Sequence, residues 1–131
     1  MKKIIYLNIF FLIVLLMPIN GFSKSIPNLI GKWQGENIKS SLKKGFIRSH
    51  NIVEITEQKN RLFKGYVIHK GGKEEFVGVI KSDRKNFFWA DSSDDDGKVI
   101  GTILKKNKIE TCYLDSGRDA IAGCSILIRN K

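Results

Sequence analysis

A chain of 131 residues, 42% of them hydrophobic, is long enough for one domain with a single core and too short for two. Its 23 lysines and arginines outnumber its 13 aspartates and glutamates, which gives a formal net charge of +10. The basic residues are spread along the sequence without a run of five or six, and no nucleic-acid-binding motif surrounds them, so a nucleic-acid partner is not predicted.

Residues 1–23 have the pattern of a secretory signal peptide. Two lysines precede an apolar run over 4–19, and Gly21 and Ser23 occupy the small-residue positions of a cleavage site. The run of about 16 residues is shorter than the roughly 20 that a helix needs to cross a bilayer. We therefore expect a periplasmic or secreted protein without a stable membrane span. Cleavage removes two lysines and leaves a single domain over 24–131 with a net charge of +8.

The mature chain has the periodicity of strands after a short lead. A helical turn is predicted at 25–29, with Ser25 as its cap and Pro27 in its first turn. Beyond it, alternating or β-branched and aromatic segments are separated by short turns rich in glycine, asparagine and aspartate. The predicted strands are 30–38, 46–58, 61–70, 74–82, 85–91, 98–106, 108–114 and 122–129.

Short connections between these segments predict an up-and-down meander. An open meander would expose two long edges, and closing it into a barrel removes them. Gly65, Gly78 and Gly101 each fall in the middle of a predicted strand, where glycine marks a bend, a bulge or a close approach. The predicted fold is all-β, an eight-stranded antiparallel up-and-down β-barrel, whose interior is either packed solid or holds one small ligand.

A tryptophan between two glycines opens the first predicted strand. Gly31 lets the chain turn into the strand, and Trp33 is placed to plug one end of the barrel. Arg129, in the last strand, is placed to lie over the indole, which is favourable by roughly 0.5–2 kcal/mol. Gly31-Lys32-Trp33 together with Arg129 resembles the calycin superfamily, which includes lipocalins, fatty-acid-binding proteins and avidins. The resemblance implies a barrel in which a basic residue of the final strand packs across that tryptophan. It does not extend to biotin binding, because only one other tryptophan is present.

The only two cysteines, Cys112 and Cys124, are predicted to form one disulfide. They flank the turn "LDSGRDA" at 114–120 symmetrically, as the two strands of a hairpin would. Closing a loop of this length stabilises a domain by about 3 kcal/mol in the chain-entropy model. Two free thiols are the alternative, and a metal site is disfavoured because the nearest histidine is His69.

No catalytic constellation is recognisable, so the sequence predicts a non-enzymatic protein without a cofactor. His50 and His69 are the only histidines, and both are expected at the surface or rim. The loop "DSSDDDG" at 91–97 is the strongest metal candidate. Asp91, Asp94 and Asp96 would be its oxygen ligands for Ca²⁺, although the spacing departs from the EF-hand pattern and a solvated acidic loop is the alternative.

The leading functional hypothesis is an exported barrel that binds a small hydrophobic ligand. The residues predicted to line its interior or mouth are Phe63, Tyr66, Phe76 and Trp89. One alternative is a protein-interaction or inhibitor barrel, because Ser116-Gly117-Arg118 resembles the inhibitory loop of bacterial lysozyme inhibitors in a general way. The other is a basic protein that associates with an envelope component such as anionic lipid or cell-wall polymer.

Overall fold

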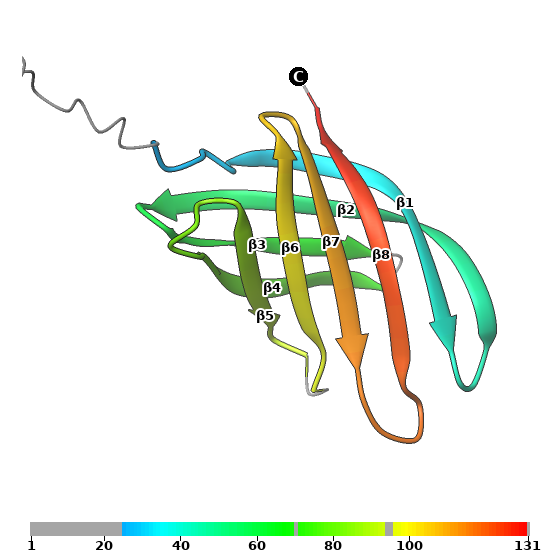
Figure 1. Cartoon of the computed structure of the whole chain (residues 1–131). Helices are drawn as coiled ribbons and strands as arrows, with labels where there is room; N and C mark the ends of the chain where they lie inside the picture. Colours follow the sequence, from blue (N-terminus) through cyan, green and yellow to red (C-terminus); the bar gives the residue numbers. More distant parts are fainter. Residues whose placement is uncertain (1–24, 70, 94–95, 131) are drawn as a thin grey trace, which may run out of the picture.

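The computed structural model describes residues 25–69, 71–93 and 96–130, and the predicted signal peptide lies outside them. Eight antiparallel strands form one closed barrel in which each strand pairs with its neighbours in the sequence (Figure 1). The prediction of an up-and-down β-barrel is confirmed. The strands are β1 (Gly31–Ser41), β2 (Gly45–Lys59), β3 (Leu62–His69), β4 (Gly72–Ile80), β5 (Asn86–Asp91), β6 (Lys98–Lys105), β7 (Lys108–Asp115) and β8 (Ile121–Arg129).

The barrel closes where β1 pairs with β8. The register runs from Trp33 opposite Arg129 to Ser41 opposite Ile121. Because consecutive strands alternate in direction, the β2–β3, β4–β5 and β6–β7 turns lie at one end, which we call the closed end, together with Trp33. The other four turns lie at the open end. Turns that alternate along the sequence therefore lie at opposite ends of the barrel.

Apolar side chains fill the closed half of the interior. In β2, Val53 and Ile55 are buried while Glu54 and Thr56 on the opposite face are not, as the alternation in the sequence predicts. The largest fully buried side chains are Trp33, Phe87, Leu29, Ile55, Ile80, Ile109, Leu127 and Val53. Val53, the one nearest the middle of the barrel, lies directly opposite Trp33, so these side chains occupy the half of the barrel that ends at Trp33.

Two of the mid-strand glycines provide room for phenylalanine rings. Gly78 lies opposite Phe63, and Gly101 lies opposite Phe87. A Cβ atom at these glycines would lie 2.3 Å from the Phe63 ring and 2.0 Å from the Phe87 ring. Each ring therefore lies flat across its neighbouring strand, and the strand curves around it. The third, Gly65, meets the backbone of β2 beside a register shift.

The prediction of a helical turn at 25–29 is wrong, since these residues form neither helix nor strand. The side chain of Gln58 holds them in an extended course: its Oε1 accepts from the backbone N–H of Leu29 at 2.8 Å, and its Nε2 donates to the Pro27 carbonyl at 2.8 Å. Leu29 itself is buried in the core. Burial of the Leu29 side chain and its hydrogen bond to Gln58 therefore stabilise this conformation more than the local sequence favours a turn of helix. None of the described residues forms a helix that is long and apolar enough to cross a membrane.

The predicted pairing of the cysteines agrees with the structure. Cys112 of β7 and Cys124 of β8 are directly opposite each other, with their sulfur atoms 2.08 Å apart. Both belong to the outward-facing positions of their strands, and Ser116 and Gly117 lie in the turn between them. The bond therefore clamps the last hairpin from outside and leaves the interior free.

Candidate functional site

Trp33 and Arg129 seal the closed end of the barrel. The indole is fully buried, and its Nε1 donates to the Leu29 carbonyl at 2.8 Å. The Arg129 guanidinium carbon lies 4.3 Å from the centre of the indole ring, and one of its nitrogens donates to the Asn28 carbonyl at 2.5 Å and to the Lys106 carbonyl at 3.1 Å. Burial lowers the pKa of Arg129 from its ordinary value. Together they block entry to the interior from this side.

Gly31 performs the role predicted for it. Its φ of +134° lies in a region that favours glycine. A Cβ atom there would also lie 3.4 Å from the side chain of Arg129. The glycine therefore provides both the backbone turn into β1 and the room for the arginine that covers Trp33.

The open half of the barrel is hollow. It encloses a cavity of about 160 Å³ to which every strand contributes. Its polar wall includes Asn37, Asn51, Thr111 and Ser125, and Asn51 Nδ2 donates to Ser125 Oγ at 3.1 Å. The lining residues are Asn37, Lys39, Asn51, Val53, Val67, Glu74, Trp89, Asp91, Ser93, Val99, Thr111, Tyr113, Gly123 and Ser125.

Charged groups line the cavity on opposite walls. Glu74 of β4 and Asp91 of β5 face it from neighbouring strands. Lys39 faces it from β1, which is four strands away from β5 in either direction around the barrel. The Lys39 side chain passes over Gly123, where an added Cβ would lie 2.4 Å from the Cβ of Lys39. The mouth of the cavity therefore has an acidic side and a basic side, with two carboxylates against one ammonium.

Both carboxylates have local partners at the rim. Glu74 Oε1 lies 3.0 Å from Nε2 of His69. Asp91 accepts from the backbone N–H of Ser93 at 3.2 Å and from its hydroxyl. These contacts hold the carboxylates in place at the rim, and the backbone N–H and hydroxyl of Ser93 bring no charge of their own to Asp91. The acidic side of the mouth remains available to a ligand.

Trp89 forms the floor of the cavity. It is 5% exposed and stacks on Phe76, with ring centres 4.6 Å apart, and on Phe87 at 5.8 Å. Its buried Nε1 has no hydrogen-bond partner among the described residues. An unpaired buried N–H costs about 1–3 kcal/mol. The unpaired indole N–H of Trp89 therefore lowers the stability of the barrel when no ligand is bound.

The structure brings three of the four predicted ligand-binding residues together. Phe63, Phe76 and Trp89 face inward, but only Trp89 lines the cavity, because the two phenylalanines belong to the packed core. The inward placement predicted for Tyr66 is wrong. It lies on the outer face between Glu54 and Glu75 on the neighbouring strands, with Lys73 Nζ 5.4 Å from its ring centre.

Val67 occupies the inward position beside Tyr66. Sequence reasoning missed the polar lining of the cavity. In β1, every second residue after Trp33 faces the same side of the strand as Trp33, and this series includes Asn37 and Lys39. The two-residue periodicity of the strand is the sequence feature that places these polar residues inside the barrel.

Of the predicted calcium ligands, Asp91 lines this cavity, whereas other residues that the sequence singled out lie apart from it. His50 is exposed on the outer face opposite Glu36, and Ser116-Gly117-Arg118 are exposed in the β7–β8 turn. Among residues 25–69, 71–93 and 96–130, no cluster of three or more histidine, cysteine, aspartate or glutamate side chains is arranged to hold a metal ion. Asp94 of the candidate calcium loop lies outside these residues.

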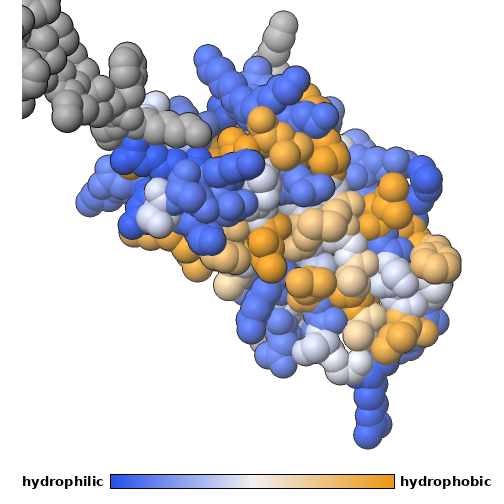
Figure 2. All heavy atoms as spheres, viewed as in Figure 1, coloured by the Kyte–Doolittle hydropathy of each residue, from blue (hydrophilic) through white to orange (hydrophobic). Residues whose placement is uncertain are grey.

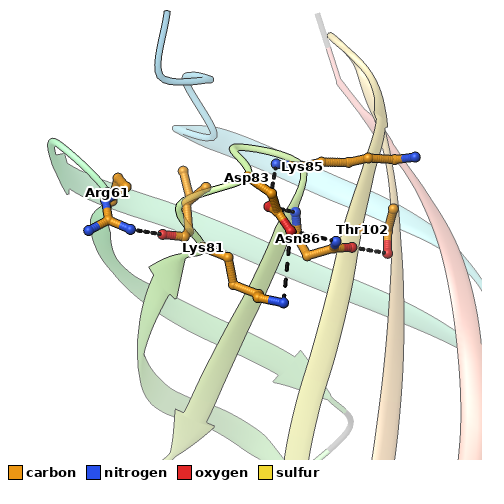
Figure 3. A network of polar contacts seen from close by, with 7 residues as sticks. Arg61, Lys81, Asp83, Lys85, Asn86 and Thr102 are labelled. Carbon is orange, nitrogen blue, oxygen red and sulfur yellow. Dashed lines mark hydrogen bonds and ion pairs between the residues drawn. The ribbon is translucent and has the colours of Figure 1, made fainter. Parts of the chain in front are cut away.

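At the closed end, Asp83 organises the β4–β5 turn (Figure 3). Its Oδ1 accepts from the backbone N–H groups of Lys85 and Asn86, both at 2.9 Å, and its Oδ2 accepts from the Asn86 side chain at 2.9 Å. Asn86 in turn accepts from the Thr102 hydroxyl at 2.9 Å. The hydrogen bonds from Asn86 and Lys85 lower the pKa of Asp83 to about 2.

This pKa predicts a pH-dependent contribution to stability. The unfolded carboxyl, with an ordinary pKa of 3.8, binds a proton more readily than the folded one. The Asp83 carboxylate therefore stabilises the fold above about pH 4, and this contribution declines as the pH falls towards 2. Thermal melts of Asp83→Ala are expected to show a lower Tm than the parent at pH 6, with a difference that shrinks at pH 3 and is lost as the pH falls through 2. Ser82→Ala, in the same turn, is the control, and a difference for Asp83→Ala that does not change with pH would contradict this account.

Comparisons with known proteins support the fold and go no further. No protein-family model matches the chain, and no curated protein matches its sequence. A solved structure described as a redesigned beta barrel, b11L5F_LGL, superposes with a TM-score of 0.51. The alignment has 16% sequence identity and covers 79% of this chain and 92% of that one. At this identity the likeness concerns the barrel alone.

Proposed function

We propose that the protein is an exported, non-enzymatic binding protein that holds a small polar molecule bearing an ammonium group in the open half of its barrel. The observation that supports this proposal is the division of the interior into a packed apolar half and a hollow half with a polar lining. A barrel that needed only stability would gain from filling both halves.

The size and lining of the cavity favour a small polar ligand over the hydrophobic one expected from the sequence. A cavity needs about 10–15 Å³ to hold one water, so a volume of about 160 Å³ has room for several waters or for one small ligand. A hydrocarbon placed there would deprive Asn37, Thr111 and Ser125 of hydrogen-bonding water, at a cost of about 1–3 kcal/mol for each polar group left unpaired. A ligand with its own polar groups avoids this cost.

The charges at the mouth favour a cationic group on the ligand. Glu74 and Asp91 outnumber Lys39, so the cavity is locally acidic in a protein whose net charge is +10. An ammonium beside the two carboxylates forms charge-assisted hydrogen bonds, which are about twice as strong as neutral ones. Trp89, Val53 and Val99 provide apolar contact for the body of the ligand.

We also propose that the protein is exported and that it is related to the calycins. The signal-peptide pattern at 1–23 and the disulfide between Cys112 and Cys124 are both typical of proteins outside the cytoplasm. The contact between Arg129 and the Trp33 ring has the geometry that the calycin resemblance implies. Calycin barrels bind small ligands in their interior, which agrees with a cavity open at one end.

Three ligands of nearly the same shape test the proposal. Tyramine, 4-ethylphenol and 4-hydroxyphenylacetate share a phenol ring and differ mainly in charge at the other end. Isothermal titration calorimetry is expected to show tyramine binding about tenfold tighter than 4-ethylphenol, a difference of about 1.4 kcal/mol, and no binding of the acid. Replacing Asp91 with asparagine or Glu74 with glutamine is expected to remove most of the preference for tyramine.

A matched control is available one residue away. Glu75 follows Glu74 in β4 but points outward, so Glu75→Gln changes the net charge equally and is expected to leave binding unchanged. Equal affinity for all three ligands would overturn the charge assignment. Val99 lines the cavity, so a phenylalanine at this position would occupy part of it. If none of the three ligands binds and Val99→Phe has unaltered thermal stability, the proposal that the cavity is a binding site is overturned.

A further inference from the structure

The fold gathers at one end of the barrel the basic residues that the sequence spreads out. Because alternate turns of the meander meet at the closed end, β2–β3, β4–β5 and β6–β7 place their charges side by side. Over residues 59–61, 81–85 and 105–108 these turns carry eight basic side chains and one acidic side chain, Asp83. The basic residues are Lys59, Arg61, Lys81, Arg84, Lys85, Lys105, Lys106 and Lys108.

One acidic side chain in these turns faces eight basic ones. Asp83 lies beside Lys81, with 3.8 Å between the charged atoms. Lys105 and Lys108 lie directly opposite each other at the ends of β6 and β7. Like charges in opposite positions destabilise a pair of strands. The arrangement therefore costs stability and does not serve to hold the turn together.

Apolar side chains are exposed among these cations. Leu104 is 43% exposed and precedes the β6–β7 turn, Leu62 is 60% exposed at the start of β3, and Ile26 of the lead is exposed as well. A groove between the lead and the β4–β5 and β6–β7 turns is lined by Ile26, Leu104, Arg84, Lys85, Lys105 and Lys106. Figure 2 shows hydrophobic side chains among the hydrophilic ones that project from the upper end.

The open end has a different character. The described residues of its turns include Lys43, Lys44 and Arg118, but also Asp96 and Asp119. Lys43 Nζ lies 3.5 Å from an Asp119 carboxylate oxygen, so part of this charge is already paired. The excess positive charge in the turns is therefore concentrated at the closed end, opposite the mouth of the cavity.

We propose that the closed end docks on an anionic lipid bilayer, with its lysines and arginines at the phosphate groups and Ile26, Leu62 and Leu104 in the headgroup region. Each lysine or arginine near such a surface contributes about 1 kcal/mol. Exposed aliphatic side chains surrounded by basic ones are typical of surfaces that lie on membranes. Docking in this orientation would leave the cavity mouth facing away from the bilayer.

Two observations favour a lipid surface over a nucleic acid. Single-stranded nucleic acids bind by stacking successive bases on exposed aromatic rings. Trp33, Phe63 and Phe87 at the closed end are buried, and among the described residues beside the basic turns Phe88, next to Lys81, is the one exposed ring. The lead at 25–30 also packs beside the basic turns and places Ile26, an exposed aliphatic side chain, among them.

The test compares equal changes in charge at the two ends. Vesicles of phosphatidylcholine alone, or mixed equally with phosphatidylglycerol, are sedimented with the mature chain, residues 24–131, that the proposed cleavage leaves. The parent is expected to bind only the mixed vesicles, and less tightly as salt is added. Reversing two charges in Lys105→Glu/Lys106→Glu is expected to reduce this binding at least about tenfold. Lys43→Glu/Lys44→Glu changes the net charge by the same amount at the open end and is expected to reduce it only slightly.

The apolar contribution has its own pair of variants. Leu104→Ser is expected to weaken binding to mixed vesicles several-fold. Phe46→Ser, at a residue 93% exposed in β2 near the open end, is expected to have no effect. Every variant begins at residue 24, so the apolar run at 4–19 contributes to binding in none of them.

Three results would overturn the proposal: equal loss of vesicle binding in both double variants, no preference for phosphatidylglycerol, or binding of duplex DNA by the closed end without binding of vesicles. The outcome is separable from that of the proposed function, because tyramine titrations of Lys105→Glu/Lys106→Glu are expected to match the parent.

Discussion

Replacing Trp33 with alanine is expected to lower the free energy of unfolding by about 3–5 kcal/mol. The indole is fully buried in the closed end, and its removal also leaves the Leu29 carbonyl without a donor. Arg129 would lose the ring on which it lies. Because small domains are stable by only about 5–15 kcal/mol, a large fraction of the stability depends on this side chain. Urea denaturation followed by circular dichroism measures the loss.

A second aromatic residue provides the control for Trp33. Phe88 is 41% exposed on the outer face, and Phe88→Ala is expected to cost less than about 1 kcal/mol. If Trp33→Ala does not fold, Trp33→Phe retains most of the ring and its stability can still be measured. A double-mutant cycle of Trp33→Phe with Arg129→Met then isolates the interaction of the guanidinium with the ring. Equal losses for Trp33→Ala and Phe88→Ala would show that the closed end does not depend on the indole.

Gly35→Ala is expected to destabilise the barrel by about 1–3 kcal/mol or more, although it adds a single methyl group. The new Cβ would lie 1.9 Å from the Ile126 carbonyl oxygen of β8. A backbone oxygen in a paired strand cannot rotate away as the end of a side chain can. The two strands that close the barrel would have to separate at this point. Thermal melting measures the effect.

Gly71→Ala is the matched control for Gly35→Ala. There the nearest atoms to an added Cβ are those of the His69 ring, 3.3 Å away at the end of an exposed side chain. The alanine also restricts the unfolded chain, which stabilises by about 0.4–1 kcal/mol where the native backbone accepts it. We expect Gly71→Ala to be neutral or stabilising. A neutral Gly35→Ala would show that β1 and β8 are farther apart than described.

The strands were predictable because their apolar and polar residues alternate, or their β-branched and aromatic residues cluster, in the sequence. In residues 85–91, Phe87 and Trp89 alternate with Phe88 and Ala90, and the structure buries the first pair and exposes the second. The glycines in the middle of strands were recognised as unusual, but their role depends on which residue lies opposite them. That Gly101 accommodates the ring of Phe87 follows from the register between β5 and β6, which no local pattern contains.

The cavity was not predictable in the same way. Inward polar residues such as Asn51 and Thr111 look like surface residues in a sequence, because alternation is interpreted from apolar positions. In β3 the run Tyr66-Val67-Ile68 is apolar on both faces, so the pattern does not show which side is inside. Tyr66 was placed in the interior together with Phe63, although two positions three residues apart fall on opposite faces of a regular strand. The structure has Val67 at the inward position.

The charge asymmetry depends on topology rather than on any stretch of sequence. Lys59, Lys85 and Lys106 are more than 20 residues apart from one another, and each lies in an unremarkable polar turn. They become neighbours only because an up-and-down barrel sends every second turn to the same end. The composition therefore predicted a basic protein, but not that the basic residues would share a surface.

The pairing of β1 with β8 also constrains how the barrel assembles. The other seven pairings join strands that are adjacent in the sequence, so each can form as a hairpin soon after its residues are available. The partner of Trp33 lies 96 residues later, at Arg129. Until β8 has formed, β1 has an unpaired edge beside a large apolar ring, and such an edge invites pairing with other chains. The docking of β8 thus decides whether β1 pairs within its own chain or stays open to another.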